Sequence, residues 1–478
     1  SDWDVFNNQG GRAISGGEVI NLVADFTNFL QPSSEALKAV MTTESPYAEV
    51  LVDEVTLGRL ATEQTRRNAQ QPFQVFVSSD APMEEDLILR ITYQDTAYQD
   101  FEFHTVTVNL SYLDITTRRI TTTLTSNGRV GYLTFGPGKG SGFIYDDQSL
   151  LYEMGLIVSG QVDTLTTVTD AVRNAQGGQN DGFEATSLVR REIPAPFGDE
   201  FLRGAMNEPV DSSTLLFPLP VKIDYRGVAW ENEKYVVVAY DLTNTGSNPV
   251  ADVRVGLFAD WDVTAFNDVA RWDDVSQTGY VRSVAGGDAF VGIHPLTFPA
   301  LQQYRAIDNA DSQFGTLDGF TDEEKRLALS EGVTFTEAGG TNGADVAHVT
   351  GNGPFTINAG ETISLLYALV AGDDLNDLRQ TSMRADAAYD QVLAATPPAP
   401  KSGLRVVPNP AADGRARLFW EASRAQNWSV AWYDLTGREV QRGQSTSGTE
   451  IAVPQVPGLY VLRVSDGAIT VHERVVVY

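Results

Sequence analysis

The run Tyr235-Val236-Val237-Val238-Ala239-Tyr240 is rich in valine and tyrosine, which are residue types that favour β-strands. Comparable runs with alternating apolar and polar residues recur at 73–77 and 86–93. Signals for helices are few. The segment 321–329 begins with a threonine suited to cap a helix and has an acidic first turn, and 376–393 carries apolar residues on roughly one face. We therefore expect an all-β protein built from packed sheets.

The length of the chain predicts several domains. A chain of 478 residues exceeds what one core normally holds, since domains average about 150 residues. The first domain should contain an opening strand at 17–28 and a closing strand at 101–110. We expect multidomain β-sandwiches, namely an immunoglobulin-like sandwich at 1–112, a larger central two-sheet sandwich at 113–395, a proline-rich linker at 396–403 and a small immunoglobulin-like domain at 404–478.

The composition excludes several kinds of site and partner. The chain has no cysteine, which excludes disulfides, thiolate metal sites and cysteine nucleophiles. Its formal net charge is -29, from 63 acidic and 34 basic residues, and this charge repels the phosphates of nucleic acids. There is no run of about 18 apolar residues, so we expect no transmembrane segment. An acidic surface keeps a protein soluble, and outside the cell it can also collect calcium.

Asp260 and Asp262 flank Trp261 in a predicted strand, so their carboxylates share one face about 7 Å apart. Such a pair can share a cation, act as acid and base in glycoside hydrolysis, or cap the strand end through backbone hydrogen bonds. Asp308 and Asp311 add oxygen atoms in a loop, where ordinary turns explain them about as well as a metal does. Asp260, Asp262, Asp308 and Asp311 are therefore candidate ligands for calcium, the one possible cofactor.

The C-terminal part carries three separated motifs. Pro408-Asn409-Pro410 fixes an extended entry, Leu435-Thr436-Gly437 supplies a turn between two strands, and Gly458 opens an alternating strand. In order and spacing the motifs resemble the type A C-terminal sorting domain of cargo exported through the type IX secretion system of Bacteroidetes-type bacteria. The residues that carry the resemblance are Pro408, Asn409, Pro410, Tyr433, Asp434, Leu435, Gly437, Arg438, Gly458, Tyr460, Leu462 and Arg463.

This resemblance covers 404–478 and implies a protein that is secreted or associated with the cell surface. The implied partners are the type IX translocon and the outer-membrane components that handle cargo during export. The family's sorting domain is often removed, or attached to a surface lipid, after export.

A second resemblance covers the first two domains. They are similar to the region that follows the catalytic domain in some large, secreted, subtilisin-like serine peptidases of the S8 family. The segments that carry this similarity are Thr125-Ser126-Asn127-Gly128-Arg129-Val130-Gly131-Tyr132, Leu150-Leu151-Tyr152-Glu153-Met154-Gly155-Leu156, Gly256-Leu257-Phe258-Ala259-Asp260-Trp261-Asp262, Ala306-Ile307-Asp308-Asn309 and Asp318-Gly319-Phe320-Thr321-Asp322-Glu323-Glu324-Lys325.

The catalytic motifs of that peptidase family have no counterpart in this sequence. The family needs a serine that meets a histidine base held by an aspartate, each in a recognisable local setting. The one segment partly similar to the family's serine motif is Thr381-Ser382-Met383, which lies in a predicted amphipathic helix. The histidines are scattered, and we expect packing or surface roles for all four, which are His104, His294, His348 and His472.

These observations predict a non-catalytic, extracellular binding or structural region of a type IX-secreted protein. An alternative is a self-assembling filament or surface-layer subunit, a homo-oligomer in which a segment such as 1–8 is donated to a neighbour. A second alternative is a carboxylate-based hydrolase centred on Asp260 and Asp262.

Overall fold

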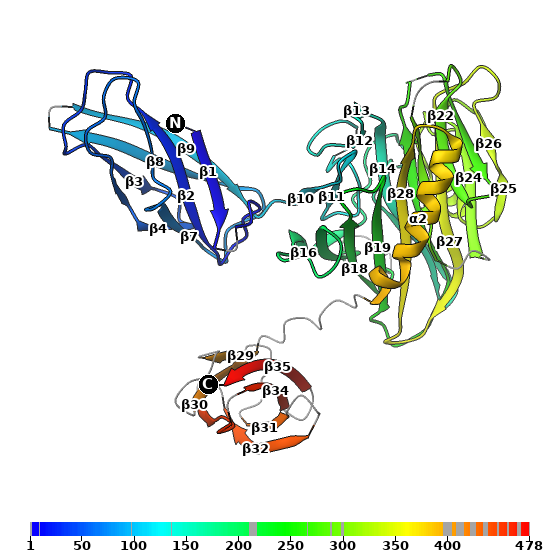
Figure 1. The fold of residues 1–478 in the computed structure, drawn as a ribbon. Coiled ribbons are helices and arrows are strands. Elements are labelled where there is room, and N and C mark those ends of the chain that lie inside the picture. Colours follow the sequence, from blue (N-terminus) through cyan, green and yellow to red (C-terminus); the bar gives the residue numbers. More distant parts are fainter. Residues whose placement is uncertain are drawn as a thin grey trace. The chain divides into compact units, whose positions relative to one another are not determined.

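The chain is all-β in a computed structural model that contains two helices among the residues it describes (Figure 1). By its internal contacts it divides into two compact units, 1–393 and 394–478. The residues described are 2–8, 10–96, 98–134, 136–209, 218–264, 266–286, 289–297, 301–394, 404–407, 415–420, 427–433, 438–446, 449–456, 458–465 and 470–477. The prediction of multidomain β-sandwiches is confirmed, whereas the predicted linker at 396–403 lies outside the described residues.

The N-terminal sandwich consists of two antiparallel sheets around one apolar core. One sheet has the order β1-β2-β7-β4 with β6 also paired to β2, and the other has the order β5-β3-β8-β9. The core lies between them and includes Leu22, Phe73 and Leu89, all fully buried. The strands are β1 (Asp2–Asn7), β2 (Val19–Thr27), β3 (Lys38–Thr43), β4 (Ala48–Val52), β5 (Glu54–Thr56), β6 (Thr65–Arg67), β7 (Phe73–Val77), β8 (Glu85–Asp95) and β9 (Tyr98–Val108).

The strand pairing describes both ends of this sandwich. An earlier strand, β1, precedes the predicted opening strand at 17–28 and pairs with it in antiparallel register from Asp2 opposite Asp25 to Asn7 opposite Ile20. Tyr112 pairs with Thr125 in the next domain, so it lies beyond the first sandwich. The polar composition of the first residues hid β1, because only Trp3 and Val5 of this strand pack against the core.

The central domain stacks a six-stranded sheet on a nine-stranded sheet, with a small third sheet beside them. The small sheet contains β10 (Tyr112–Thr116), β11 (Ile120–Thr125), β12 (Phe143–Tyr145) and β13 (Gln148–Ser149). The six-stranded sheet runs β15 (Leu165–Asp170), β14 (Leu151–Val162), β20 (Val250–Trp261), β27 (Val346–Ile357), β24 (Gln302–Asp308) and β25 (Val333–Phe335). The nine-stranded sheet runs β16 (Glu184–Arg191), β17 (Glu200–Asn207), β18 (Val221–Ala229), β19 (Tyr235–Asn244), β28 (Thr362–Gly372), β23 (Phe290–Pro295), β22 (Thr278–Ser283), β21 (Asp268–Asp273) and β26 (Glu337–Ala338).

Helix α2 (Leu375–Ala394) covers the outer face of the nine-stranded sheet, as Figure 1 shows. Strand β19 therefore has apolar neighbours on both faces: Val236 and Val238 face the core between the sheets, while Val237 faces α2. This double burial explains why the run at 235–240 is continuously apolar rather than alternating. None of the described helices is long and apolar enough to cross a membrane.

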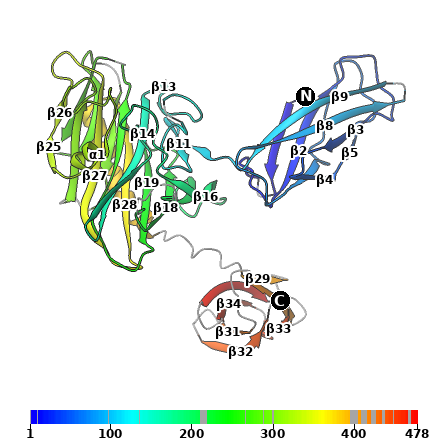
Figure 2. The same cartoon turned by 180° about the vertical axis from the view of Figure 1, so that it is seen from behind.

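Helix α1 (Asp322–Ala328) covers the outer face of the six-stranded sheet, on the opposite side of the stack from α2 (Figure 2). Thr321 and Glu324 form a capping box at its start, which confirms the helix predicted from the capping threonine and acidic first turn. The helix also carries Lys325 into the interior, where its Nζ lies 2.8 Å from Asp170 Oδ2 and both side chains are fully buried. Burial raises the pKa of Asp170 against the opposing effect of Lys325.

Lys325→Met should lower the free energy of unfolding by about 3 kcal/mol, because it leaves the Asp170 carboxylate buried without its cation. Chemical denaturation should also show that a second change, Asp170→Asn, recovers much of this loss. Lys38→Met is the matched control, since Lys38 pairs with Glu54 at the surface. This variant should change the free energy of unfolding by less than about 1 kcal/mol. Equal losses in the single and double variants would contradict the proposed role of the pair.

The C-terminal unit contains a three-stranded and a four-stranded antiparallel sheet. The first has the order β29 (Leu404–Val407), β30 (Arg415–Trp420) and β33 (Glu450–Ala452). The second has the order β32 (Glu439–Ser445), β31 (Trp428–Tyr433), β34 (Gly458–Ser465) and β35 (Thr470–Val477). Residues of both sheets, among them Leu418, Trp432 and Leu462, form its separate core.

Candidate functional sites

Asp260 lies near the end of β20, in a buried polar cluster rather than in an open site. Arg173 donates to Asp260 and also, over 2.7 Å, to Glu153. Asn309 donates to Asp260 Oδ1 over 3.0 Å, and the Thr316 hydroxyl donates to Asn309 Oδ1 over 2.7 Å. Burial acts to lower the pKa of Arg173, but the carboxylates of Asp260 and Glu153 outweigh burial and raise it. Arg173 is therefore a permanent cation that holds two buried carboxylates.

Asp262 follows β20 and is partly buried. Burial and the carboxylates of Asp345 and Asp268 raise its pKa to about 6, while Arg173 acts in the opposite direction. A cation would relieve this repulsion, which keeps the calcium prediction for Asp262 open. Among the described residues, however, no group of three or more histidine, cysteine, aspartate or glutamate side chains is arranged to hold a metal ion.

The two loop carboxylates accept backbone hydrogen bonds within their own turns. Asp308 Oδ1 accepts from the amide of Ala310 over 3.1 Å, and Asp311 Oδ1 accepts from the amide of Gln313 over 2.7 Å. These bonds are those of ordinary turns, in which each carboxylate orders the loop around it. Their role as calcium ligands stays a prediction.

Asp262→Asn should stabilise the protein by about 1 kcal/mol at pH 8 in the presence of a chelator and have little effect at pH 4. The variant is expected to be more stable because a raised carboxyl pKa means that the folded state binds the proton of Asp262 more tightly than the unfolded chain does. Stability is therefore lost as the pH rises from about 4 to about 6, and asparagine removes this loss. Thermal unfolding at several pH values measures the effect.

Calcium provides the second arm of the same measurement. If millimolar calcium raises the unfolding temperature of the wild type and not of Asp262→Asn, the predicted cation role is supported, because a ligand of the folded state alone must stabilise it. Unchanged unfolding temperatures in calcium and in chelator would exclude a structural calcium site at Asp262.

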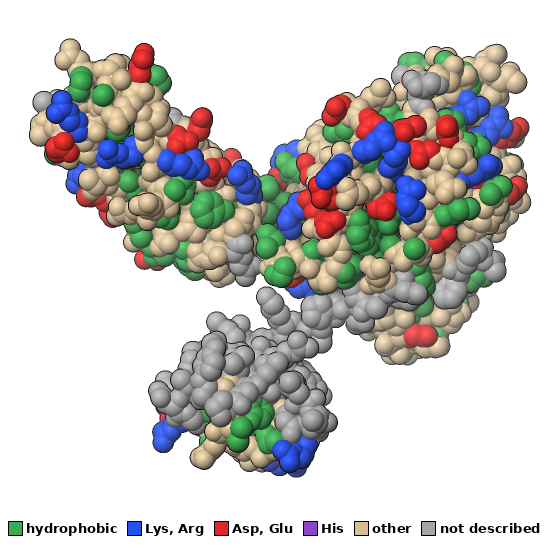
Figure 3. Space-filling model, viewed as in Figure 1, with side chains coloured by type: hydrophobic (Ala, Val, Ile, Leu, Met, Phe, Trp, Pro, Cys, Tyr) green, Lys and Arg blue, Asp and Glu red, His purple; other side chains and the backbone are tan. Residues whose placement is uncertain are grey.

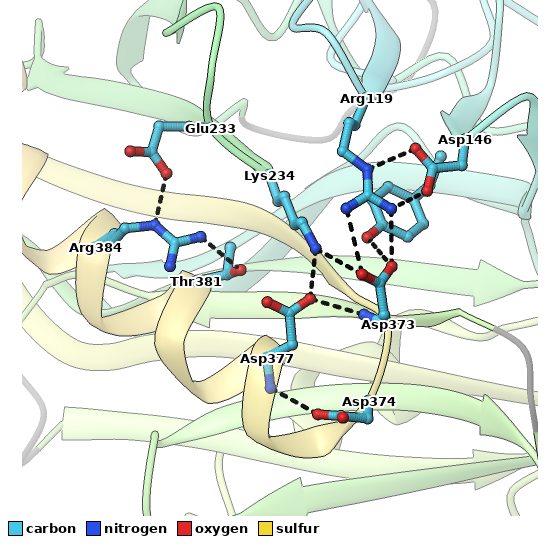
Figure 4. A network of polar contacts seen from close by, with 10 residues as sticks. Arg119, Asp146, Glu233, Lys234, Asp373, Asp374, Asp377, Thr381 and Arg384 are labelled. Atoms are coloured by element: carbon cyan, nitrogen blue, oxygen red, sulfur yellow. Dashed lines mark hydrogen bonds and ion pairs between the residues drawn. The ribbon is translucent and has the colours of Figure 1, made fainter.

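A second polar network lies where β28 leads into α2, and Figure 4 shows it from close by. Asp373 is its centre. Its carboxylate accepts from Arg119 Nη2 over 2.9 Å, from the Tyr145 hydroxyl over 2.6 Å and from Lys234 Nζ over 2.9 Å. Lys234 also binds Asp377 in the first turn of α2 over 2.6 Å. The network joins the small sheet, the β18–β19 connection and α2.

This network is a surface feature in which opposite charges are matched within the chain. Figure 3 likewise shows acidic and basic side chains close together on the viewed face of the central domain. The hydrogen bond from Arg119, followed by that from Tyr145, lowers the pKa of Asp373. We assign the network a structural role, because its donors and acceptors bind one another.

Asp373→Asn should lower the free energy of unfolding by about 1 kcal/mol at pH 7, since the carboxylate is more than half exposed and partly screened. A carboxyl group whose pKa is lowered by folding stabilises the fold at pH values above its ordinary pKa near 4. This contribution is lost as the pH falls through the pKa of the folded state. The difference between wild type and variant should therefore vanish in strong acid. Asp147→Asn is the control, an exposed aspartate close in sequence to Asp146; an equal effect there would contradict the prediction.

Ser382, His294 and an aspartate lie along one chain of hydrogen bonds, but not as a catalytic triad. Nε2 of His294 is 3.0 Å from Asp386 Oδ1, and its Nδ1 is 3.1 Å from the Thr278 hydroxyl. Thr278 is in turn 3.0 Å from the Ser382 hydroxyl, which donates to the carbonyl of Leu378 over 3.1 Å. Thr278 separates the serine from the histidine, and Ser382 is fully buried. The chain of hydrogen bonds ties α2 to β22 and β23.

The predicted sorting residues are only partly within the described structure. Tyr433 ends β31, Gly458 begins β34, and Tyr460 and Leu462 are buried in the C-terminal core. Arg438 and Arg463 are exposed. Those that lie outside the described residues are Pro408, Asn409, Pro410, Asp434, Leu435 and Gly437.

The N-terminal sandwich has an open cleft that sequence reasoning missed. Its volume is about 730 Å³. Buried Phe26, Leu57 and Leu60 line it, together with Phe29 and Leu30, which are 78% and 53% exposed. The one signal in the sequence is the adjacent pair Phe29-Leu30 in a loop, where large apolar side chains have no sheet to cover them.

Comparisons with known proteins do not place the chain in a family. No family model matches it, and no curated protein matches it. Among solved structures, a polysaccharide lyase matches with 14% identity over 77% of this chain and 47% of that chain, at a TM-score of 0.27. The chain thus spans less than half of that structure, and so low a TM-score carries no argument about activity.

Proposed function

We propose that this chain is the non-catalytic binding and structural part of a protein exported by the type IX route, and that it acts outside the cell. The observation that carries the proposal is the order of three sorting-type motifs within 404–478. That 394–478 forms a compact unit with its own core supports the proposal, because a sorting domain is expected to be a separate unit.

The burial of Asp260 and Ser382 argues against hydrolysis. Asp260 is 4% exposed and is held by Arg173 and Asn309, so it cannot approach a substrate without breaking this cluster. Ser382 is buried behind Thr278. We therefore do not propose the carboxylate-based hydrolase.

A self-assembling subunit is the second candidate, and strand β9 favours it. This strand forms an edge of its sheet, and Phe101 and Phe103 lie exposed on it with ring centroids 5.6 Å apart. Exposed edge strands with apolar side chains are surfaces on which other chains can pair. Assembly through the segment 1–8 would be costlier, because Asp2–Asn7 already pairs with β2. Negative-stain images with only dispersed particles at high concentration would argue against assembly.

Export provides the direct test of the proposal. In a bacterium with a type IX system, Arg438→Ala/Arg463→Ala should remain in the periplasm, while the wild type reaches the surface or medium. Both side chains are exposed, so the double variant should still fold. Arg415→Ala changes another exposed arginine of the same unit and should be exported. A chain lacking 404–478 that is exported normally would overturn the proposal.

A further inference from the structure

Strand β9 is the longest edge strand of the described sheets, with 11 residues. It pairs with β8 along its whole length without a bulge, and no described strand pairs with its other side. Edge strands in natural proteins are usually short or bulged, or carry proline or lysine. Register shifts interrupt the edge strands β4, β16 and β32, whereas β9 is regular and contains neither proline nor lysine. The edge of β9 therefore lacks the features that usually prevent pairing with another chain.

The backbone groups of alternate residues of β9 point to this edge. Thr43 of β3 donates to the carbonyl of Ile88 over 2.9 Å, so the backbone groups of Ile88 face β3 and those of its partner Thr105 face away from β8. The amide of Phe101 likewise donates over 2.8 Å to a side chain of its own strand, which a carbonyl of another strand can replace. Phe101, Phe103 and Thr105 thus present donors and acceptors to a partner strand.

The side chains beside this edge include exposed aromatic rings. Phe101 and Phe103 lie on the outer face of the sheet and are 49% and 61% exposed, with their ring centroids 5.6 Å apart. Ile88 lies on the same face of β8, since it pairs with Thr105, and it is also more than half exposed. A strand added beside β9 would remove part of this apolar surface from water, which favours association.

The side chains of β9 favour one antiparallel register between two copies of the strand. With Phe103 on the two-fold axis, Glu102 of each copy lies opposite His104 of the other, and Phe101 lies opposite Thr105. With the axis at Glu102, two carboxylates would face each other, which destabilises a sheet. With the axis at His104, the carboxylate of Glu102 would face a buried valine. The register centred on Phe103 therefore gives this carboxylate a hydrogen-bond donor.

His104 can donate to a carboxylate without being displaced. Trp3 stacks on the face of the imidazole, with ring centroids 4.9 Å apart, whereas hydrogen bonds of the ring nitrogens lie in the ring plane. Burial lowers the pKa of His104, so at neutral pH the bond is donated by a neutral imidazole. Glu102 accepts from the Tyr93 hydroxyl over 2.8 Å, and one carboxylate accepts from several donors. The strand is thus complementary to a second copy of itself.

We propose that two copies of this chain pair through β9, in the antiparallel register that places Phe103 on the two-fold axis. The β5-β3-β8-β9 sheets of the two copies then continue as a single sheet, and the two Phe103 rings pack against each other. Because both copies use the same surface, the contact closes as a dimer and does not by itself extend into a filament. The inference rests on the self-assembling subunit described above as the second candidate, and not on the route of export.

Cysteine variants of the full chain test the register, because the wild type has no cysteine. Phe101→Cys and Thr105→Cys chains with different affinity tags, mixed and mildly oxidised, should form a disulfide-linked dimer that holds one chain of each kind. Residues opposite each other in such a pair have Cα atoms about 5.5 Å apart, which suits a disulfide. Neither variant should cross-link alone, because its two cysteines would lie roughly 13 Å apart along the strands.

Charge variants test whether the edge carries the contact. Phe103→Lys should raise the dissociation constant of the dimer at least about tenfold in sedimentation velocity, because two cations then face each other at the axis. Ile88→Lys makes the same change on the same face, one strand away from the edge, and should change the constant by less than about threefold. Mixing Phe103→Lys with Phe103→Glu should restore dimers. Both wild-type side chains are more than half exposed, so the variants should fold, and their unfolding temperatures check this.

Each other outcome overturns the inference. Equal weakening by Phe103→Lys and Ile88→Lys would place the contact on the face of the sheet rather than at its edge. Cross-links between Phe101→Cys and Phe103→Cys chains would move the axis to Glu102. A wild type that stays monomeric at every concentration would remove both this inference and the self-assembling candidate. Dimers that Phe103→Lys leaves unchanged would keep that candidate and remove this inference alone.

Discussion

The ion pairs of Arg173 are the interaction on which the central domain depends. Glu153 and Asp260 are direct partners on the neighbouring strands β14 and β20, so two carboxylates would face each other in the interior without a cation between them. Like charges opposite one another destabilise a sheet, and burial makes the repulsion worse. Arg173 contacts both carboxylates, and the loop carrying Asn309 and Thr316 closes over them. This loop therefore stabilises the end of the six-stranded sheet.

The same constraint brings together the five segments on which the proposed resemblance to the post-catalytic region of subtilisin-like peptidases rests. Four of the five segments that carry the resemblance place a side chain in this cluster: Arg129 and Glu153 are paired, and Asp260 binds Asn309. The fifth supplies Lys325, which pairs with Asp170 close in sequence to Arg173. Segments far apart in the sequence thus meet because buried charges need partners. Such a pattern reports the requirements of a fold.

Local patterns predicted the elements well, but not the partners of polar residues. The capping threonine and acidic turn placed α1, and the apolar run at 235–240 placed β19. Asp260 was identified as important, yet its partner Arg173 lies 87 residues away and nothing in the spacing of either residue indicates the other. The cleft was not predicted for the same reason, because Phe29 lies in the loop after β2 whereas Asp100 lies on β9 of the other sheet. Periodicity shows which side chains of a strand share a face. Which residues of other elements contact that face is known only from the folded chain.

The two kinds of carboxylate in the molecule point to different uses. In the central domain, Asp260 and Asp373 bind cations of the same chain, which leaves little field for another molecule. Burial still raises the pKa of Asp260 to about 7 against the opposing effect of Arg173. At the cleft, Asp100 is oriented by a hydroxyl and a backbone amide, which fix its position without cancelling its charge. A carboxylate held by neutral donors keeps its attraction for an outside cation. The cleft beside Asp100 also exposes the apolar side chains of Phe29 and Leu30.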